Sequence, residues 1–121
     1  MNVTRALIIK KHWLDLILSG EKTWEIRGSN TTIRGKIGLI ESGSGLVVGE
    51  CELVDSIKLD PIAFHENSYK HLIGAPERPY KSKTHAWVLN NAKRYDKPMP
   101  YKHLMGAVIW VKLEGDKWPK N

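Results

Sequence analysis

The sequence contains a single cysteine, Cys51, and lacks any apolar run long enough to cross a membrane. One cysteine cannot form a disulfide within the chain, which favours a reducing compartment. A membrane helix needs roughly 18 or more consecutive apolar residues, and the N-terminus has no hydrophobic segment typical of a signal peptide. These absences predict a cytoplasmic protein with no membrane partner.

Motifs for metals and for nucleophilic triads are missing as well. The histidines have no recognisable metal-ligand spacing, and a second cysteine is not available to complete a zinc site. The histidines concerned are His65, His71, His85 and His103. No Gly-x-Ser-x-Gly nucleophile motif occurs. We therefore expect neither a metal site nor an organic cofactor.

Basic residues outnumber acidic ones, with 19 Lys and Arg against 13 Asp and Glu and a net charge of +6. Five tryptophans accompany this charge. Basic surfaces bind polyanions through counterion release, and aromatic faces can stack on unpaired bases. The same composition also suits a protein whose lysines keep it soluble and whose tryptophans fill its core. Composition therefore permits a nucleic-acid partner without requiring one.

Hydrophobic periodicity predicts a strand, a helix and a second strand within the first thirty residues. Residues 5–10 have the pattern of a short buried strand, and apolar residues over 13–18 share one helical face. Gly20 suits the left-handed position that ends a helix. Residues 23–27 then alternate between polar and apolar, as expected of a strand.

The rest of the chain is rich in strand patterns, and one glycine within it, Gly49, is expected to mark a bulge or a close backbone approach. An Asp-Pro pair at 60–61 is typical of a helix start. The expected elements are strands at 36–41, 46–58, 84–89 and 107–113, a turn at 42–45, a helix at 61–71, an irregular loop at 74–83 and a long connection at 90–103.

These elements predict one α+β domain over residues 1–121, with a core at about 5–113 and a polar tail at 114–121. About six strands accompany two to three helices, which are too few helices for a doubly wound sheet. We therefore expect a small mixed β-barrel with helices at its ends. The sequence favours no particular oligomeric state.

The stretch from Gly20 to Arg27 (Gly-Glu-Lys-Thr-Trp-Glu-Ile-Arg) is the best candidate for a functional site. In extended backbone, Thr23, Glu25 and Arg27 share one face, while the intervening apolar side chains point the other way. The apolar face, Trp24 and Ile26, can anchor the strand to a core. The polar face then presents a carboxylate and a guanidinium to a ligand.

Each charged residue of this stretch has two interpretations. Lys22 is either a partly desolvated base or nucleophile with a lowered pKa, or a solvated cation that interacts favourably with a helix C-terminus. Glu25 and Arg27 either form an ordinary exposed ion pair, or bind an amino group and a phosphate or carbonyl oxygen of a substrate. Convergence of all three inside a concave site would favour the functional interpretation.

Other candidates lie outside this stretch. Trp13 is expected to form a wall of the pocket, with Tyr80 and Tyr101 as alternatives in loops. Ser42 opens a Ser-Gly-Ser-Gly turn whose backbone N–H groups can face an anion, although such a sequence is most often just a hairpin turn. The tryptophans expected within strands are more typical of a core, namely Trp24, Trp87 and Trp110.

The pattern Gly20-x-Lys22-Thr23-x-Glu25-x-Arg27, preceded by Lys11-His12-Trp13, resembles the signature of the ASCH domain family. Further segments follow in the order that the family shows, so the similarity spans about residues 5–113. These segments are Gly35-Lys36-Ile37, Gly49-Glu50-Cys51, Ala86-Trp87-Val88-Leu89 and Gly106-Ala107-Val108-Ile109-Trp110-Val111. The resemblance implies a small barrel similar to the PUA fold.

The resemblance also implies RNA-related work. Some members bind RNA, some are reported to cut RNA, and small bacterial members hydrolyse N4-acylated cytidines with a motif lysine, a threonine three residues later and a distant glutamate. Lys22 matches that lysine. Glu25 occupies the threonine position, which is a departure; Thr23 is adjacent to it, and Glu66 is our candidate for the distant acid.

Our leading hypothesis is a cleft for a modified nucleoside or an unpaired RNA base, with hydrolysis of an amide on N4-acylated cytidine. Lys22, Glu25 and Thr23 are the catalytic candidates, and the substrate-binding candidates are Arg27, Trp13, Ser42 and Glu66. The alternatives are a non-catalytic RNA-binding module and a metal-dependent ribonuclease, for which a lone carboxylate motif is poor support.

Overall fold

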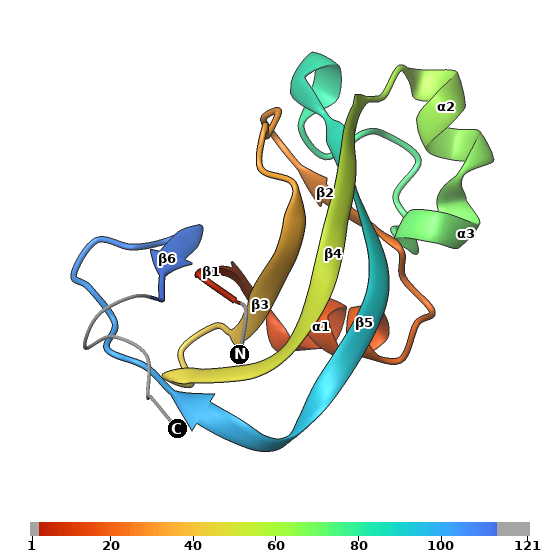
Figure 1. The fold of residues 1–121 in the computed structure, drawn as a ribbon. Coiled ribbons are helices and arrows are strands. Elements are labelled where there is room, and N and C mark those ends of the chain that lie inside the picture. The colour runs from red at the N-terminus through yellow and green to blue at the C-terminus, as the bar shows by residue number, and fades with distance from the viewer. Residues whose placement is uncertain (1–2, 114–121) are drawn as a thin grey trace.

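The structure, a computed structural model, describes residues 3–113. It contains six β-strands, three α-helices and one short 3₁₀-helix (Figure 1). In chain order these are β1 (Arg5–Ile9), α1 (Lys11–Leu18), β2 (Trp24–Arg27), β3 (Gly35–Glu41), β4 (Leu46–Lys58), α2 (Pro61–Glu66), α3 (Ser68–His71), η1 (Lys81–Lys83), β5 (His85–Pro100) and β6 (Trp110–Lys112).

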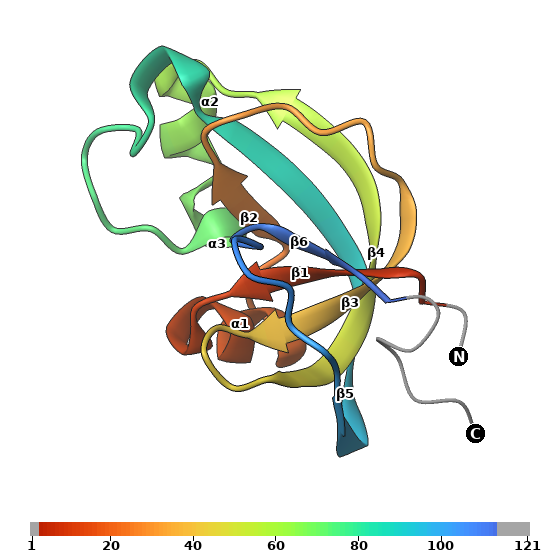
Figure 2. The same ribbon diagram turned by 90° about the vertical axis from the view of Figure 1, so that its left-hand side faces the viewer.

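All six strands form one sheet in the order β2-β5-β4-β3-β1-β6. β1 and β3 run parallel, whereas the other neighbouring pairs are antiparallel. The sheet curves strongly, and in Figure 2 both helical segments lie to its left. The expected α+β class and strand number are confirmed. The sheet stays open, because β2 and β6 form its two edges and do not pair with each other.

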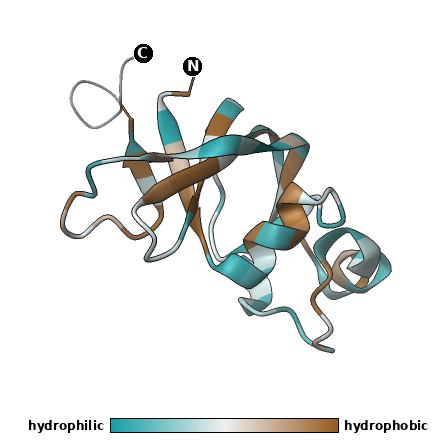
Figure 3. Cartoon of the chain, turned by 90° about the horizontal axis from the view of Figure 1, so that it is seen from below, coloured by the Kyte–Doolittle hydropathy of each residue, from teal (hydrophilic) through white to brown (hydrophobic). Residues whose placement is uncertain are grey.

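The core is built mainly from strand residues: β1 and β3 carry consecutive buried apolar residues, and hydrophobic stretches appear brown along the strands in Figure 3. Leu14 and Ile17 of α1 are fully buried in a core cluster that also contains Trp87. Trp24 and Ile26 belong to a separate cluster that joins β2 to α2. As expected, these two side chains fasten the motif strand to the core.

The second helical segment begins as the Asp-Pro pair predicts. The Asp60 carboxylate accepts a hydrogen bond of 2.7 Å from the backbone N–H of Ala63, and Pro61 occupies the first helical position. The single helix expected over 61–71 is interrupted at Asn67, whose φ of −108° and ψ of 25° are not helical. Two short helices therefore replace one long helix.

The long connection expected over 90–103 is wrong, because β5 continues as a strand to Pro100. Only β4 pairs with the far part of β5, and Met99 and Pro100 stand opposite Val47 and Leu46. The other side of this part is an unpaired edge, where proline costs no ladder hydrogen bond. Asn91 adopts a positive φ of 53° beside a register shift, which marks a bulge.

Gly49 allows the close backbone approach that its place in a strand predicts. A Cβ atom there would lie 2.5 Å from the Lys93 carbonyl oxygen and 2.7 Å from Leu18 Cδ2. The final strand, expected over 107–113, is shorter and covers 110–112. The expected tail at 114–121 lies outside the described residues. Across the part of the chain that is described, no helix is both long and apolar enough to cross a membrane.

Candidate functional site

A cavity of about 380 Å³ opens where β1, α1 and β2 meet the segment that follows α3. Its polar lining contains Lys22, Glu25 and Arg27, so the structure brings the three charged residues of the motif together. The remaining lining residues are Ile8, Lys10, Trp13, Ile26, Ser42, Ile73, Pro79, Tyr80 and Val108. The volume lies within the usual range for small-molecule pockets.

Lys22 is buried at this cavity, with an exposed fraction of 1%. Its ammonium donates a hydrogen bond to the backbone carbonyl of His71, lies 4.6 Å from the centre of the Trp13 ring and is 3.9 Å from Glu25 Oε1. Burial lowers the pKa of Lys22 to about 8, while Glu25 opposes this shift and the Arg27 cation adds to it. With this pKa, about a tenth of the amine is neutral at pH 7.

Glu25 and Arg27 form a tight pair within the cavity. Arg27 Nε donates to Glu25 Oε2 over 3.0 Å, Nη2 forms an ion pair with the same oxygen at 2.9 Å, and Nη2 donates to the Ile8 carbonyl over 2.9 Å. The Arg27 Nη1 amine has no acceptor within residues 3–113, which leaves it able to donate to a substrate oxygen. Glu25 and Arg27 therefore form a structural ion pair, and both residues also line the cavity.

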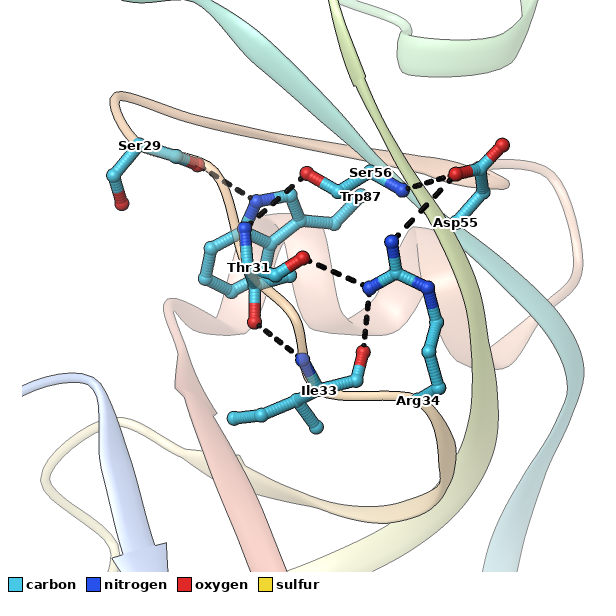
Figure 4. Close-up of polar contacts among 7 residues, drawn as sticks. All are labelled: Ser29, Thr31, Ile33, Arg34, Asp55, Ser56 and Trp87. Carbon is cyan, nitrogen blue, oxygen red and sulfur yellow. Dashed lines mark hydrogen bonds and ion pairs between the residues drawn. The ribbon is translucent and has the colours of Figure 1, made fainter.

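Trp87 supports the Arg27 side chain from the core side. The guanidinium carbon lies 5.5 Å from the centre of the Trp87 ring, and the indole N–H donates to the Ser29 carbonyl over 2.9 Å. Figure 4 shows the polar contacts that hold the segment between β2 and β3 against Trp87 and β4. Arg34 donates to the Thr31 carbonyl over 2.8 Å and pairs with Asp55 of β4 at 3.7 Å.

His71 is a structural feature of the site that the sequence reasoning did not identify. Its ring is fully buried and stacks on Phe64 with ring centres 4.2 Å apart. Nδ1 accepts from the Ile73 N–H over 3.0 Å, so Nε2 carries the proton and donates to the Phe64 carbonyl over 2.7 Å. Burial lowers the pKa of His71, which favours this neutral form. The ring thereby fixes the backbone that holds Lys22.

Two aromatic side chains form walls of the cavity. Trp13 comes from α1, and Tyr80 comes from the loop before η1. The Tyr80 ring packs on the backbone of Gly28, where an added Cβ would lie 2.8 Å from Tyr80 Cδ1. Trp13, our first choice for a wall, and Tyr80, one of its alternatives, therefore lie at the same cavity.

Of the other site residues predicted from the sequence, one lines the cavity and two do not. Ser42 lines the cavity from the end of β3. Thr23 is half-buried and does not line it, because β2 starts at Trp24 and the Thr23 backbone instead bonds to Lys70 and Leu89. Glu66 is exposed at the end of α2, away from the cavity lining. Ile73 and Val108 also line the cavity but were not among the predicted site residues, although Val108 belongs to one of the segments that resemble the family.

The ASCH domain family profile matches residues 7–99. The chain belongs to the ASCH domain family. ASCH domains have a PUA-like fold that is associated with RNA binding. No curated protein sequence matches this ASCH chain.

Solved structures of an ASCH protein from Zymomonas mobilis share the fold. One aligns with a TM-score of 0.70 at 14% identity over 93% of this chain and 89% of that chain. A serine-to-alanine variant of that protein aligns with a TM-score of 0.66 at 15% identity over 93% and 89% of the two chains. A tyrosine-to-phenylalanine variant gives 0.67 at 14% identity over 93% and 91%.

The side chains that line the cavity are capable of acid–base chemistry. Among residues 3–113, no three His, Cys, Asp or Glu side chains gather in a way that would hold a metal ion. The cavity instead offers an amine with a lowered pKa, a buried carboxylate and a guanidinium between aromatic walls. An amine that is partly neutral near pH 7 can accept a proton and then return it.

Proposed function

We propose that this ASCH protein binds a modified pyrimidine nucleoside or an unpaired RNA base in the cavity and hydrolyses the amide of an N4-acylated cytidine. The main support for this proposal is that Lys22 is buried at the cavity and that burial lowers its pKa to about 8. A solvated lysine has a pKa near 10.4 and is almost entirely protonated at neutral pH. Burial therefore makes Lys22 a usable base.

Substrate orientation follows from the walls and the charged groups. A pyrimidine ring can stack on Trp13 or Tyr80, because every base has an aromatic face. The acyl group then lies toward the charged end of the cavity. Glu25 Oε1 is available to position a water molecule or the exocyclic N–H, while Arg27 Nη1 holds a carbonyl oxygen.

In the proposed reaction, neutral Lys22 takes a proton from water as the water oxygen attacks the acyl carbon. A new C–O bond forms, and the carbonyl becomes an oxyanion that the Lys22 ammonium and Arg27 stabilise. Collapse of this intermediate breaks the bond between the acyl carbon and N4. Lys22 returns its proton to N4, so the products are a carboxylic acid and cytidine.

The test is turnover of N4-acetylcytidine by the wild type and by Lys22→Met, which keeps the length of the side chain and removes the amine. Lys58→Met is a matched control, since Lys58 is exposed at the end of β4 and does not line the cavity. We expect turnover by the wild type and by the control, and a loss of at least a hundredfold in Lys22→Met. Absent turnover in the wild type, or equal turnover in a folded Lys22→Met, would overturn the proposal.

A second candidate is a binding module that holds an unpaired RNA base without chemistry. Two features favour it: Glu25 occupies the position of the threonine in the hydrolytic members that the motif resembles, and Arg27 engages Oε2 of its carboxylate. This candidate predicts RNA affinity that falls with salt concentration and yields no product. The alternative of a metal-dependent ribonuclease gains no support, because no cluster of metal-ligating side chains is found among residues 3–113.

A further inference from the structure

A second cavity of about 670 Å³ adjoins the first. The two cavities share Ile8, Ser42 and Val108 in their linings. Both therefore open on one continuous surface, on either side of the end of β1 and the segment before β6. The first cavity is large enough for a nucleoside, so this adjoining space is more than a nucleoside needs.

The chemistry of the second cavity differs from that of the first. Its lining contains an aromatic pair, Tyr101 and His103, in which the phenol oxygen lies 2.9 Å from His103 Nδ1 and the ring centres are 5.7 Å apart. His103 is exposed and Tyr101 is half-buried. Neither lies beside the charged residues of the motif. Aromatic rings such as these provide stacking surfaces for bases.

The opposite wall is the loop after β3, which supplies hydrogen-bond donors. The backbone N–H groups of Gly43 and Gly45 have no acceptor within residues 3–113, and both glycines have positive φ angles of 81° and 71°. By contrast, the Ser44 hydroxyl is occupied, since it donates to the Glu41 carbonyl and accepts from the Leu46 N–H. These two N–H groups are separated by that of Ser44, which donates to the Glu41 carbonyl over 3.0 Å, so Gly43 and Gly45 can each donate singly to a phosphate oxygen.

We propose that the second cavity is a subsite for a nucleotide that neighbours the one held in the first cavity. The preferred substrate of the site is then a residue within a single RNA strand, in place of a free nucleoside. This proposal rests on the proposed function, because it takes the first cavity as the base site. The planes of Tyr101 and His103 are 62° apart, so the flanking base stacks on one ring of this pair and meets the other at its edge, and the linking phosphate lies near the N–H groups of Gly43 and Gly45.

The experiment compares binding of three ligands to the full chain. The first is N4-methylcytidine, which carries no amide and is not turned over by amide hydrolysis. The second is a trinucleotide RNA with this residue flanked by two uridines, and the third is the same trinucleotide with abasic flanks. We expect the wild type to bind the uridine-flanked trinucleotide on the order of tenfold more tightly than the nucleoside, and the abasic one with less of this gain.

The variants assign the gain to the second cavity. Tyr101→Ala and His103→Ala are expected to weaken trinucleotide binding by on the order of tenfold more than nucleoside binding. His103 is exposed, so its variant tests the subsite even if Tyr101→Ala fails to fold. Tyr69→Ala is the control, because Tyr69 is 67% exposed on α3 and lines neither cavity.

The subsite is overturned if the wild type binds nucleoside and trinucleotide equally, if abasic flanks give the full gain, or if the gain survives in both variants. Parallel turnover of N4-acetylcytidine separates this result from the proposed function. Turnover of N4-acetylcytidine without tighter binding of the trinucleotide overturns the subsite and leaves the proposed hydrolase function standing. A gain that depends on Tyr101 without any turnover overturns the hydrolase and supports the subsite.

Discussion

The Lys22 ammonium donates to the backbone carbonyl of His71, a residue 49 positions further along the chain. This bond joins the motif to the end of α3 and places the amine at the cavity. The His71 ring in turn holds the backbone on both sides of that carbonyl through Phe64 and Ile73. The position of the site's central amine therefore depends on a buried histidine outside the motif.

Replacing this histidine should destabilise the protein. His71→Phe keeps the stacking on Phe64 but leaves the Ile73 N–H and the Phe64 carbonyl without their partner. An unsatisfied buried group costs about 1–3 kcal/mol, so we expect a loss of roughly 2 kcal/mol or more in the free energy of unfolding. Urea denaturation of the wild type and the variant measures it.

The wild type should also lose stability as pH falls below 6.5, because the unfolded chain takes up a proton that the folded His71, with its lowered pKa, resists. This part of the pH dependence should be missing from His71→Phe. An unchanged free energy of unfolding in the variant would contradict the role given to the ring.

The buried amine of Lys22 should make stability depend on alkaline pH. Below about pH 8 the lysine is charged in both states, whereas between about 8 and 10.5 the unfolded chain binds a proton that the folded chain lacks. The free energy of unfolding of the wild type relative to Lys22→Met should therefore rise across this window, by on the order of 3 kcal/mol. Denaturation at pH 7.5 and 10.5 measures the difference, and a flat difference would contradict burial of the charge.

The charged neighbours of Lys22 should move its pKa in opposite directions. Glu25 raises the pKa of Lys22 and Arg27 lowers it. Glu25→Gln should therefore lower that pKa further, and Arg27→Met should raise it. NMR titration of the Lys22 side chain in both variants checks the signs, and shifts of the same sign would show that the two charges do not act on Lys22 as the geometry indicates.

Gly49 should tolerate no side chain. An alanine Cβ there meets the Lys93 carbonyl, a backbone atom that cannot rotate away, and we expect Gly49→Ala to cost about 1–3 kcal/mol of stability. Gly74→Ala is the matched control, since the space around Gly74 is open and its φ is not positive. Equal melting temperatures for the two variants would show that β4 and β5 are less closely packed there.

Local patterns predicted much of this fold. Alternation in residues 23–27 placed Trp24 and Ile26 in the core, and the spacing of apolar residues placed α1. The far part of β5 escaped prediction because Pro98 and Pro100 suggest a loop, and only the strand order shows that they lie on an unpaired edge. Thr23 was expected on the face of Glu25, yet the strand begins one residue after it.

The site was predictable only as far as the motif itself extends. Lys22, Glu25 and Arg27 are close in sequence, so their convergence required only the local chain path. Ile73 and Val108 reach the cavity through the fold, as does the His71 carbonyl that bonds to Lys22, and their own sequence context does not mark them as site residues. When tertiary packing determines which residues meet at a site, the local sequence pattern does not predict them.

The most direct test of the account is the pH dependence of kcat/KM for N4-acetylcytidine in the wild type. If neutral Lys22 is the base, kcat/KM should rise with pH and level off above an inflection near pH 8, the value to which burial lowers its pKa. In Lys22→Met the residual rate should lack this inflection. A wild-type rate that shows no inflection between pH 6 and 10, or the same inflection in Lys22→Met, would contradict the central role of this lysine.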